Sequence, residues 1–412
     1  MLEAIRHLHR GLELVATLPA GPSRLRYELE FQGALGGALS AAKGASAAET
    51  GEAYYRARHL CQELGDTELL ISVLSGLSTY HVARNEFGPA RDVAEHLLHL
   101  AQTRQDAEVQ LVANRAMGAC LCQLGEFTSS AAYLLRALSL YAPEKHRSIA
   151  SVAGYDARVS ALNWLMIDLF ALGQLDAAAS RSNEVLQWSR DLRHPHSTCF
   201  ALAFAVLHKL LRRVYDGTGQ LVDQLTTVAK DQDFPFWLTI ADIIRGYLIA
   251  AQGQPLSGLE LLQRGFAKFK ETGANWMEAY FLYLISQCCE MAERMDQAMC
   301  VLVTALRTID TSGERWFAAE LYRMKGDLLI AQRRERLAQT EVHYQRALQI
   351  ARQQSAKSWE LRAAMSLTRL WRDQGKRQEA HDLLAPVYGW FTEGFDTLDL
   401  KEAKTLLSEL SS

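Results

Sequence analysis

The residues best suited to chemistry in this chain are histidines that could bind a metal ion. His96 and His99 stand three residues apart, and His194 and His196 flank a proline. A protein metal site needs three or four ligands that converge on one point, and neither pair has a further ligand at a suitable spacing. The sequence therefore predicts packed or solvated histidines, with no metal site and no cofactor.

Short motifs that mark common catalytic sites are missing from the sequence. It has no phosphate-binding loop G-x-x-x-x-G-K-[ST], no G-x-G-x-x-G after a strand and no G-x-S-x-G elbow. Each of these motifs fixes backbone N–H groups or a nucleophile where a reaction needs them. Without them the usual machinery for nucleotide or ester hydrolysis is missing. We therefore expect a protein that binds rather than one that catalyses.

The composition is that of an ordinary globular protein in a reducing compartment. The 412 residues carry a net charge of −3 and are 49% hydrophobic, with 8 prolines and 26 glycines, which excludes disordered and collagen-like chains. Seven cysteines, with Cys288 and Cys289 adjacent, argue against a full disulfide framework. Glu3 and Arg6 interrupt any signal peptide, and the apolar stretch at 200–207 is too short to span a membrane. We expect a soluble, cytoplasmic protein.

A repeated pattern gives the strongest structural signal. Its clearest copy places small and large residues at fixed intervals on either side of a turn glycine: Met117, Gly118, Leu121, Gly125, Ser130, Leu134 and Ala137. This is the spacing of tetratricopeptide repeats, in which small residues let the two helices of a hairpin approach and large residues fill the gap between hairpins. The pattern predicts an all-α fold, a right-handed superhelix of helical hairpins.

A marker residue late in the second helix of each unit sets the number of repeats. It occurs nine times, at Ala57, Leu97, Ala137, Val185, Val228, Gly265, Ala305, Ala347 and Val387. The step averages about 41 residues, against roughly 34 in the common repeat, so longer helices are expected. We predict one array over residues 1–412, with a first helix in 1–22, repeats in 23–392 and a C-terminal capping helix at 398–410. The unit at 199–231 matches least well.

The register of the repeat places a set of polar and aromatic side chains on the inner wall of the superhelix. The predicted site residues in this set are Tyr247, Tyr283, Gln287, Glu290, Glu320 and Arg323, and the same register also turns Asn163, Ile167, Phe170, Ile243 and Asp327 toward the inner wall. Aromatic faces can stack on a ligand, and charged groups can orient it, so the set predicts a site for a peptide or a polar small molecule. Aromatic residues at helical spacing are more often part of the core, and we expect this of Trp164 and Phe170.

Positive charge is concentrated near the C-terminal end. Residues 333–377 contain eleven Lys and Arg against four Asp and Glu. Such a segment could bind nucleic acid or an acidic partner domain. Because the cations alternate with acidic residues and no recognition motif accompanies them, we favour a solvated helical face over a nucleic-acid site.

Several segments resemble the C-terminal region of one group of bacterial multidomain proteins. These segments are residues 2–14, 57–66, 319–329, 356–362 and 387–396. Proteins of that group carry a class III adenylate/guanylate cyclase domain, then a STAND-type AAA ATPase and then a long tetratricopeptide array. The resemblance implies a non-catalytic arm in signalling that binds a protein or peptide, an ATPase or cyclase domain included, or senses a small molecule.

The same resemblance draws attention to about eight residues inserted near 141–155. His146 and Arg147 stand where the group has a His-Arg pair, and Asp156 stands where it has a Gly-x-Asp. An arginine and a carboxylate in a long loop could clamp a ligand, or the carboxylate could tether the loop to the next helix. Both interpretations stay open.

Two other functions also stay open. The chain could be the regulatory fragment of a cyclase or ATPase signalling enzyme, in which case the activity would reside in domains absent from this sequence. It could instead be the inducer-binding domain of a STAND transcription regulator of the maltose-regulon type. Exposed aromatic residues on the inner wall would favour a small-molecule ligand, and a charged groove would favour a peptide.

Overall fold

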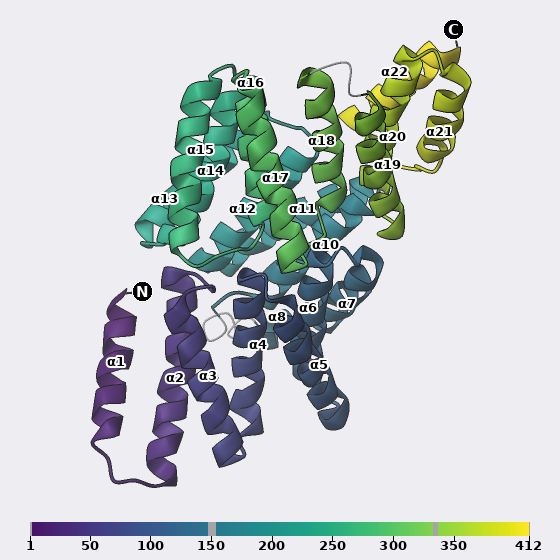
Figure 1. The fold of residues 1–412 in the computed structure, drawn as a ribbon. Helices are drawn as coiled ribbons and strands as arrows, with labels where there is room; N and C mark the ends of the chain where they lie inside the picture. Colours follow the sequence, from purple (N-terminus) through teal and green to yellow (C-terminus); the bar gives the residue numbers. More distant parts are fainter. Residues whose placement is uncertain (1, 147–153, 333–336, 412) are drawn as a thin grey trace.

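The computed structural model describes residues 2–146, 154–332 and 337–411, which form helices and no strand (Figure 1). After α1 (Leu2–Ala16) come nine helical hairpins, each with a first and a second helix. The first helices are α2 (Pro22–Lys43), α4 (Thr67–Ala83), α6 (Ala107–Gln123), α10 (Ala157–Ala171), α12 (Pro195–Leu211), α14 (Pro235–Ala251), α16 (Glu278–Met291), α18 (Ala318–Gln332) and α20 (Lys357–Asp373). The second helices are α3 (Ala48–Leu64), α5 (Phe87–Arg104), α7 (Phe127–Leu140), α11 (Leu175–Leu192), α13 (Thr218–Asp231), α15 (Pro255–Glu271), α17 (Met295–Ser312), α19 (Leu337–Gln353) and α21 (Arg377–Gly389). Two helices stand outside the hairpins, α8 (Pro143–His146) and α22 (Leu398–Ser411). The predicted all-α superhelix of nine hairpins is confirmed.

A small buried residue near the start of each second helix fixes the register of the repeat. These residues are Thr50, Ala90, Ser130, Ala178, Thr218, Gly258, Ala298, Thr340 and Ala380. Successive members are 40 residues apart except at two steps, one of 48 residues before Ala178 and one of 42 before Thr340. A small side chain here lets the second helix approach the first closely, as where the Ser130 hydroxyl donates to the Gly118 carbonyl 2.8 Å away.

One predicted marker was wrong. Val228 is only half-buried, whereas Leu225, one helical turn earlier, is fully buried and lies 40 residues from both Val185 and Gly265. The reason is local: Gly217 takes a left-handed conformation with φ 69° and starts α13 late, so a count from the apparent helix start is displaced by a turn.

The superhelix completes one turn after five hairpins, and its second turn then contacts its first. The carbonyl at the end of α4, on Ala83, accepts hydrogen bonds of 3.0 Å from the backbone N–H groups of Asn275 and Trp276 just before α16. One hairpin further on, the Gln123 carbonyl accepts from Arg315 at 2.8 Å and Trp316 at 3.2 Å. The last carbonyls of a helix have no partner within it, so these bonds satisfy groups that would otherwise need water. They also hold the second turn of the superhelix on the first.

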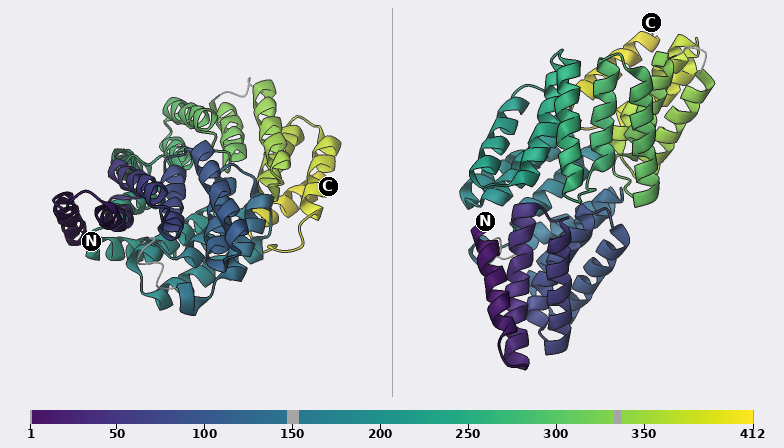
Figure 2. Two further views of the ribbon diagram at one scale, coloured as in Figure 1. Left: turned by 90° about the horizontal axis from the view of Figure 1, so that it is seen from below. Right: turned by 60° about the vertical axis from the view of Figure 1, so that its left-hand side comes forward.

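The two turns are visible as two groups of helices, purple to blue and green to yellow (Figure 1). Seen from below, the helices follow a curved path around a common axis (Figure 2). Aromatic side chains of both turns meet there. The ring of Trp276 stacks on Phe204 with centroids 5.6 Å apart, and Trp359 meets Phe170 at 5.4 Å. Trp164 and Phe170 are buried, 5% and 2% exposed, which confirms that they belong to the core.

Three further structural facts bear on the expectations from composition. No helix in the described part of the chain is long and apolar enough to cross a membrane. All seven cysteines are free thiols, six of them buried. Among the described residues no group of three or more His, Cys, Asp and Glu side chains is placed to hold a metal ion.

A buried carboxyl group sits where the two turns meet. Glu314 is fully buried, and it accepts hydrogen bonds from the Trp316 indole at 2.8 Å and from the Asn85 amide at 2.9 Å. Burial raises its pKa from 4.5 to about 7, although both hydrogen bonds favour the ionised form. Asn85 also donates to the Asn275 carbonyl at 2.8 Å, so this group belongs to the contact that closes the superhelix.

The raised pKa predicts that stability depends on pH. Glu314 binds its proton more tightly in the fold than in the unfolded chain, so its full contribution is present below about pH 4.5 and is lost as the pH rises to about 7. Between pH 5 and 8 this loss should be roughly 2 to 3 kcal/mol in the free energy of unfolding. Urea unfolding of Glu314→Gln should lack this component, while the exposed Glu260→Gln should keep it. Equal pH slopes for the wild type and Glu314→Gln would contradict the assignment.

Candidate functional site

A polar cavity of about 270 Å³ lies inside the second turn of the superhelix. We call it the axial pocket. Its walls come from the first helices α14, α16, α18 and α20, from the end of α12 with the turn that follows, and from α22. Four of the predicted site residues line it: Tyr247, Tyr283, Gln287 and Arg323. The structure thus brings together residues from three successive hairpins.

Four tyrosines form one side of the axial pocket. The hydroxyl groups of Tyr215 and Tyr247 lie 3.3 Å apart, and the rings of Tyr280 and Tyr283 stack with centroids 6.2 Å apart. Burial raises the pKa of Tyr247, Tyr280 and Tyr283, so these phenols stay neutral and can donate hydrogen bonds. This wall offers flat apolar faces together with hydroxyl groups.

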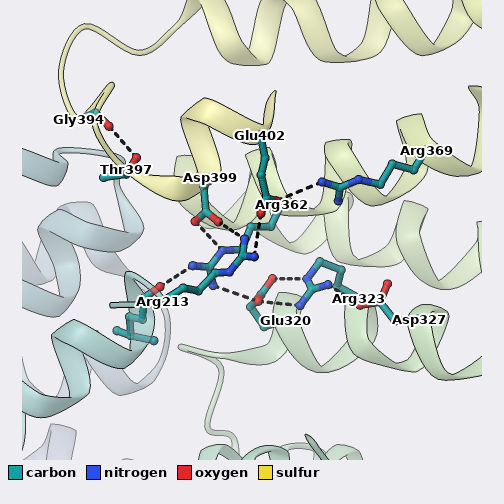
Figure 3. A network of polar contacts seen from close by, with 11 residues as sticks. Arg213, Glu320, Arg323, Asp327, Arg362, Arg369, Gly394, Thr397, Asp399 and Glu402 are labelled. Carbon is teal, nitrogen blue, oxygen red and sulfur yellow. Dashed lines mark hydrogen bonds and ion pairs between the residues drawn. The ribbon is translucent and has the colours of Figure 1, made fainter. Parts of the chain in front are cut away.

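Four arginines that line the axial pocket belong to a network with four carboxylates (Figure 3). In its inner part, the Glu320 carboxylate lies 2.8 Å from Arg323 Nε and 3.2 Å from Arg362 Nη1. Burial opposes ionisation of Glu320, but these two cations lower its pKa and keep it charged. Arg323 also pairs with Asp327. Arg362 also donates to the Leu211 carbonyl at the end of α12, which ties the two turns together once more.

The outer part of this network depends on α22. Arg362 Nε lies 2.8 Å from Asp399, and Arg213 lies 3.1 Å from Asp399 and 2.8 Å from Glu402. Glu402 also pairs with Arg369 at 3.1 Å (Figure 3). Two acidic residues of the last helix therefore neutralise cations contributed by α20 and by the turn after α12.

This pairing corrects the prediction for the basic segment. Arg362 does not belong to a solvated face, because it is buried and pairs with Asp399 of α22, whereas Arg369 and Arg372, with side chains 43% and 31% exposed, pair at the surface with Glu402 and Glu409 of the same helix. Residues 333–336 lie outside the described part. The acidic partner considered from sequence thus turns out, for these three arginines, to be intramolecular.

The remaining predicted residues lie elsewhere. Glu320 stands behind the wall of the axial pocket in the ion-pair network, and Glu290 is a half-buried residue of α16 that does not line the cavity. Burial, together with the nearby charge of Asp327, raises the pKa of Glu290. Arg147 lies outside the described residues.

Two of the predicted residues near the insertion, His146 and Asp156, lie in the described part of the chain. Both form hydrogen bonds with residues close to them in the sequence. Asp156 begins α10, where it accepts from the Val159 N–H at 3.0 Å, and it also accepts from the hydroxyl of Tyr141 at 2.6 Å. His146 Nδ1 accepts from the Ala142 N–H at 2.9 Å. Both side chains are buried, and neither lines the axial pocket. This geometry is that of a tether between loop and helix.

Among the lining residues outside the predicted site set, Asp327, Arg362 and Arg369 carry a signal in the sequence, whereas Arg213, Tyr215 and Glu402 do not. Tyr247, Gln287 and Asp327 follow one another at 40-residue steps, and Arg369 continues the series after 42 residues because two residues are inserted between α18 and α19. Arg362 follows Glu320 by the same 42 residues. In contrast, Arg213, Tyr215 and Glu402 belong to a turn and to α22, where the repeat makes no prediction.

Comparisons with known proteins support the architecture. No family model matches the sequence. An uncharacterized protein from Rhizobium meliloti (strain 1021) is 21% identical over 373 residues, which are 90% of this chain and 36% of that protein. The chain thus spans about a third of the length of this relative.

Solved structures share the fold at low sequence identity. A Rap protein complexed with Competence and Sporulation Factor is similar with a TM-score of 0.60 and 8% identity, over 95% of this chain and 100% of that one. NprR in complex with its cognate peptide NprX is similar with a TM-score of 0.51 and 13% identity, over 94% and 99%. These likenesses show a tetratricopeptide-type superhelix in this chain.

The ion-pair network predicts unequal effects for two arginines of α20. Arg362→Met should lower the free energy of unfolding by about 3 kcal/mol, because it leaves two buried carboxylates and a carbonyl short of a partner. Arg369→Met should cost less than about 1 kcal/mol, since this side chain is 43% exposed and pairs only at the rim. Chemical denaturation measures both, and similar losses would contradict the arrangement.

Proposed function

We propose that this chain is a non-catalytic binding module that holds a short peptide, free or part of a partner protein, in the axial pocket. The proposal rests on a set of polar groups in the pocket wall that have no hydrogen-bond partner within the described part of the chain. The hydroxyls of Tyr280, Tyr283 and Ser366 and the amide of Gln287 line the pocket, and none has a hydrogen-bond partner among the described residues. Because these groups face an open cavity, a ligand that enters the cavity can supply their hydrogen-bond partners.

A peptide fits this set better than a simple ion does. Gln287 offers both a donor and an acceptor, tyrosine rings offer stacking surfaces, and Arg323 and Asp327 supply both signs of charge. A peptide bond presents one N–H and one carbonyl, which such a wall can satisfy together. The Rap and NprR structures that share the fold were solved with Competence and Sporulation Factor and with the peptide NprX, which agrees with a peptide ligand.

The module's place in a signalling protein is a further part of the proposal. The relative from Rhizobium meliloti is much longer than this chain, so an output domain could adjoin the array in such a protein. In that arrangement the array is the sensing arm of a bacterial signalling protein, and a cyclase or ATPase domain is its regulated partner. The alternative ligand is a small polar inducer, which the cavity of about 270 Å³ would also accept.

We take residues 1–412 to work as one array that α22 closes. α22 packs on α20 and α21 and buries Leu400, Ala403, Leu406 and Leu410. The last repeat of a solenoid otherwise exposes an apolar face, so a terminal helix that covers it keeps the array from associating. α22 also carries Glu402, which lines the rim of the axial pocket.

A thermal-shift screen tests the proposal. The purified chain is mixed with a pentapeptide library in pools and, separately, with a set of polar metabolites. A peptide that binds the axial pocket should raise Tm in proportion to the logarithm of its concentration. Gln287→Ala and Tyr283→Phe should each weaken binding roughly five- to tenfold, because each variant loses about one hydrogen bond to the peptide.

The control is Gln263→Ala, an exposed glutamine on the second helix α15. It should bind the same peptide as tightly as the wild type. If a metabolite raises Tm for the wild type but not for Gln287→Ala, the ligand of the axial pocket is a small inducer and not a peptide. If the ligands that bind are insensitive to both pocket variants, the axial pocket is not the site.

A further inference from the structure

A second cavity, in the first turn of the superhelix, differs in chemistry from the axial pocket. It has a volume of about 90 Å³, several times the space that one water molecule needs. We call it the N-terminal cavity. First helices α2, α4, α6, α10, α12 and α14 contribute to its lining. Much of its wall is aromatic: Tyr155, Trp164, Phe200, Trp237 and Trp276.

The N-terminal cavity contains a buried cation without a counter-charge. Arg115 of α6 is 3% exposed, and its guanidinium donates one hydrogen bond of 3.2 Å to the Ser75 hydroxyl. It also lies over the ring of Tyr155, 5.3 Å from the centroid. Within the described part of the chain no carboxylate lies within ion-pair distance of it, and none lines the cavity. Arginine stays charged in proteins, so its charge is only partly compensated.

The arginines of the axial pocket differ from Arg115, because each of them has a carboxylate partner. Arg213, Arg323, Arg362 and Arg369 each have at least one carboxylate within 3.1 Å. A buried arginine that faces a cavity rather than an acidic residue is therefore a specific feature of the first turn.

Two residues of the cavity wall also carry hydrogen-bond donors that lack partners. The indole N–H groups of Trp237 and Trp276 have no hydrogen-bond partner among the described residues, although the two side chains are only 4% and 8% exposed. Trp276 comes from the second turn, and its own backbone N–H binds the Ala83 carbonyl of the first turn. An indole N–H can only donate, so both groups call for an acceptor.

From these observations we infer that the N-terminal cavity binds a small carboxylic acid with an apolar body, aromatic or branched aliphatic. The carboxylate accepts hydrogen bonds from Arg115 and from an indole N–H, and it supplies the missing negative charge. The body packs among the aromatic rings, where water is excluded. The same group occurs on a free acid and on the C-terminal residue of a peptide with a large apolar side chain. This site is independent of the axial pocket.

Isothermal titration calorimetry tests the inference with probes of matched shape. Benzoate, phenylacetate and isovalerate should bind saturably, while benzamide and benzylamine should bind at least tenfold more weakly. The tripeptides Gly-Gly-Phe and Gly-Gly-Leu, compared with their C-terminal amides, distinguish a peptide end from a free acid. If only the free tripeptides bind, the cavity recognises a C-terminus, and if only the small acids bind, it recognises a metabolite.

Variants separate a binding role of Arg115 from a purely structural one. Arg115→Met should weaken acid binding at least tenfold and leave Tm unchanged or higher, because it removes a buried charge that lacks a partner. Trp276→Phe keeps the ring, loses the N–H and should weaken binding severalfold. Arg91→Met, on the outer helix α5 where Arg91 pairs with Glu126, should bind the acids like the wild type.

Two results would overturn the inference. One is the failure of all three acids and both tripeptides to bind saturably, together with a lower Tm for Arg115→Met, which would make Arg115 a structural residue. The other is acid binding that Arg115→Met leaves unchanged. The variant Gln287→Ala should not affect these titrations, so failure here is distinguishable from failure of the axial pocket.

Discussion

The contact between successive turns of the superhelix is the constraint on which the rest of the structure depends. Helix ends of the first turn present carbonyl groups that α4 and α6 cannot satisfy internally, and backbone N–H groups preceding α16 and α18 satisfy them. Further along, the Ser358 hydroxyl and the Arg362 guanidinium do the same for Phe170 and Leu211. Because the turns touch, the inner wall is largely buried. Aromatic side chains fill much of the axis, and the polar groups within it must find partners in the protein or in a ligand.

The two cavities differ in how that requirement is met. In the axial pocket, acidic residues of α18 and α22 neutralise every arginine, and neutral hydroxyl and amide groups are left without partners. In the wall of the N-terminal cavity, and among the described residues, Arg115 has a hydroxyl partner but no carboxylate, and two indole N–H groups have no hydrogen-bond partner. The first arrangement suits an uncharged or zwitterionic polar ligand, and the second suits an anion. Under both proposals, a single closed superhelix binds two ligands of different charge, one in each turn.

Local physics explains how much the sequence could predict. The repeat depends on small and large residues within one hairpin and its neighbours, so the helices, their number and the burial of Trp164 and Phe170 were predictable. Register also predicts which side chains face the axis, and Tyr247 and Gln287 meet in one pocket for that reason. Where a glycine delayed a helix start, as at Gly217, the marker residue Val228 was misplaced by one helical turn.

Contacts between turns could not be predicted, because they join residues five hairpins apart through backbone groups that leave no pattern in the sequence. Ala83 and Trp276 are an example. Without this closure, Arg115 would be one more polar residue on an open inner wall, and Glu402 one more exposed acid on a terminal helix. Their environments follow from the three-dimensional closure, which is why neither stood out from its neighbours in the sequence.

Amide hydrogen exchange tests the closure most directly. Asn275, Trp276, Arg315 and Trp316 lie in turns before first helices, where amides of an open superhelix would exchange within seconds to minutes. If the turns are in contact, these four amides should be protected by a factor close to that of core helix amides such as Leu284, because their N–H groups are bonded to Ala83 and Gln123. Exchange as fast as that of Asp216, an exposed residue in the turn between α12 and α13, would contradict the closed superhelix and both ligand sites derived from it.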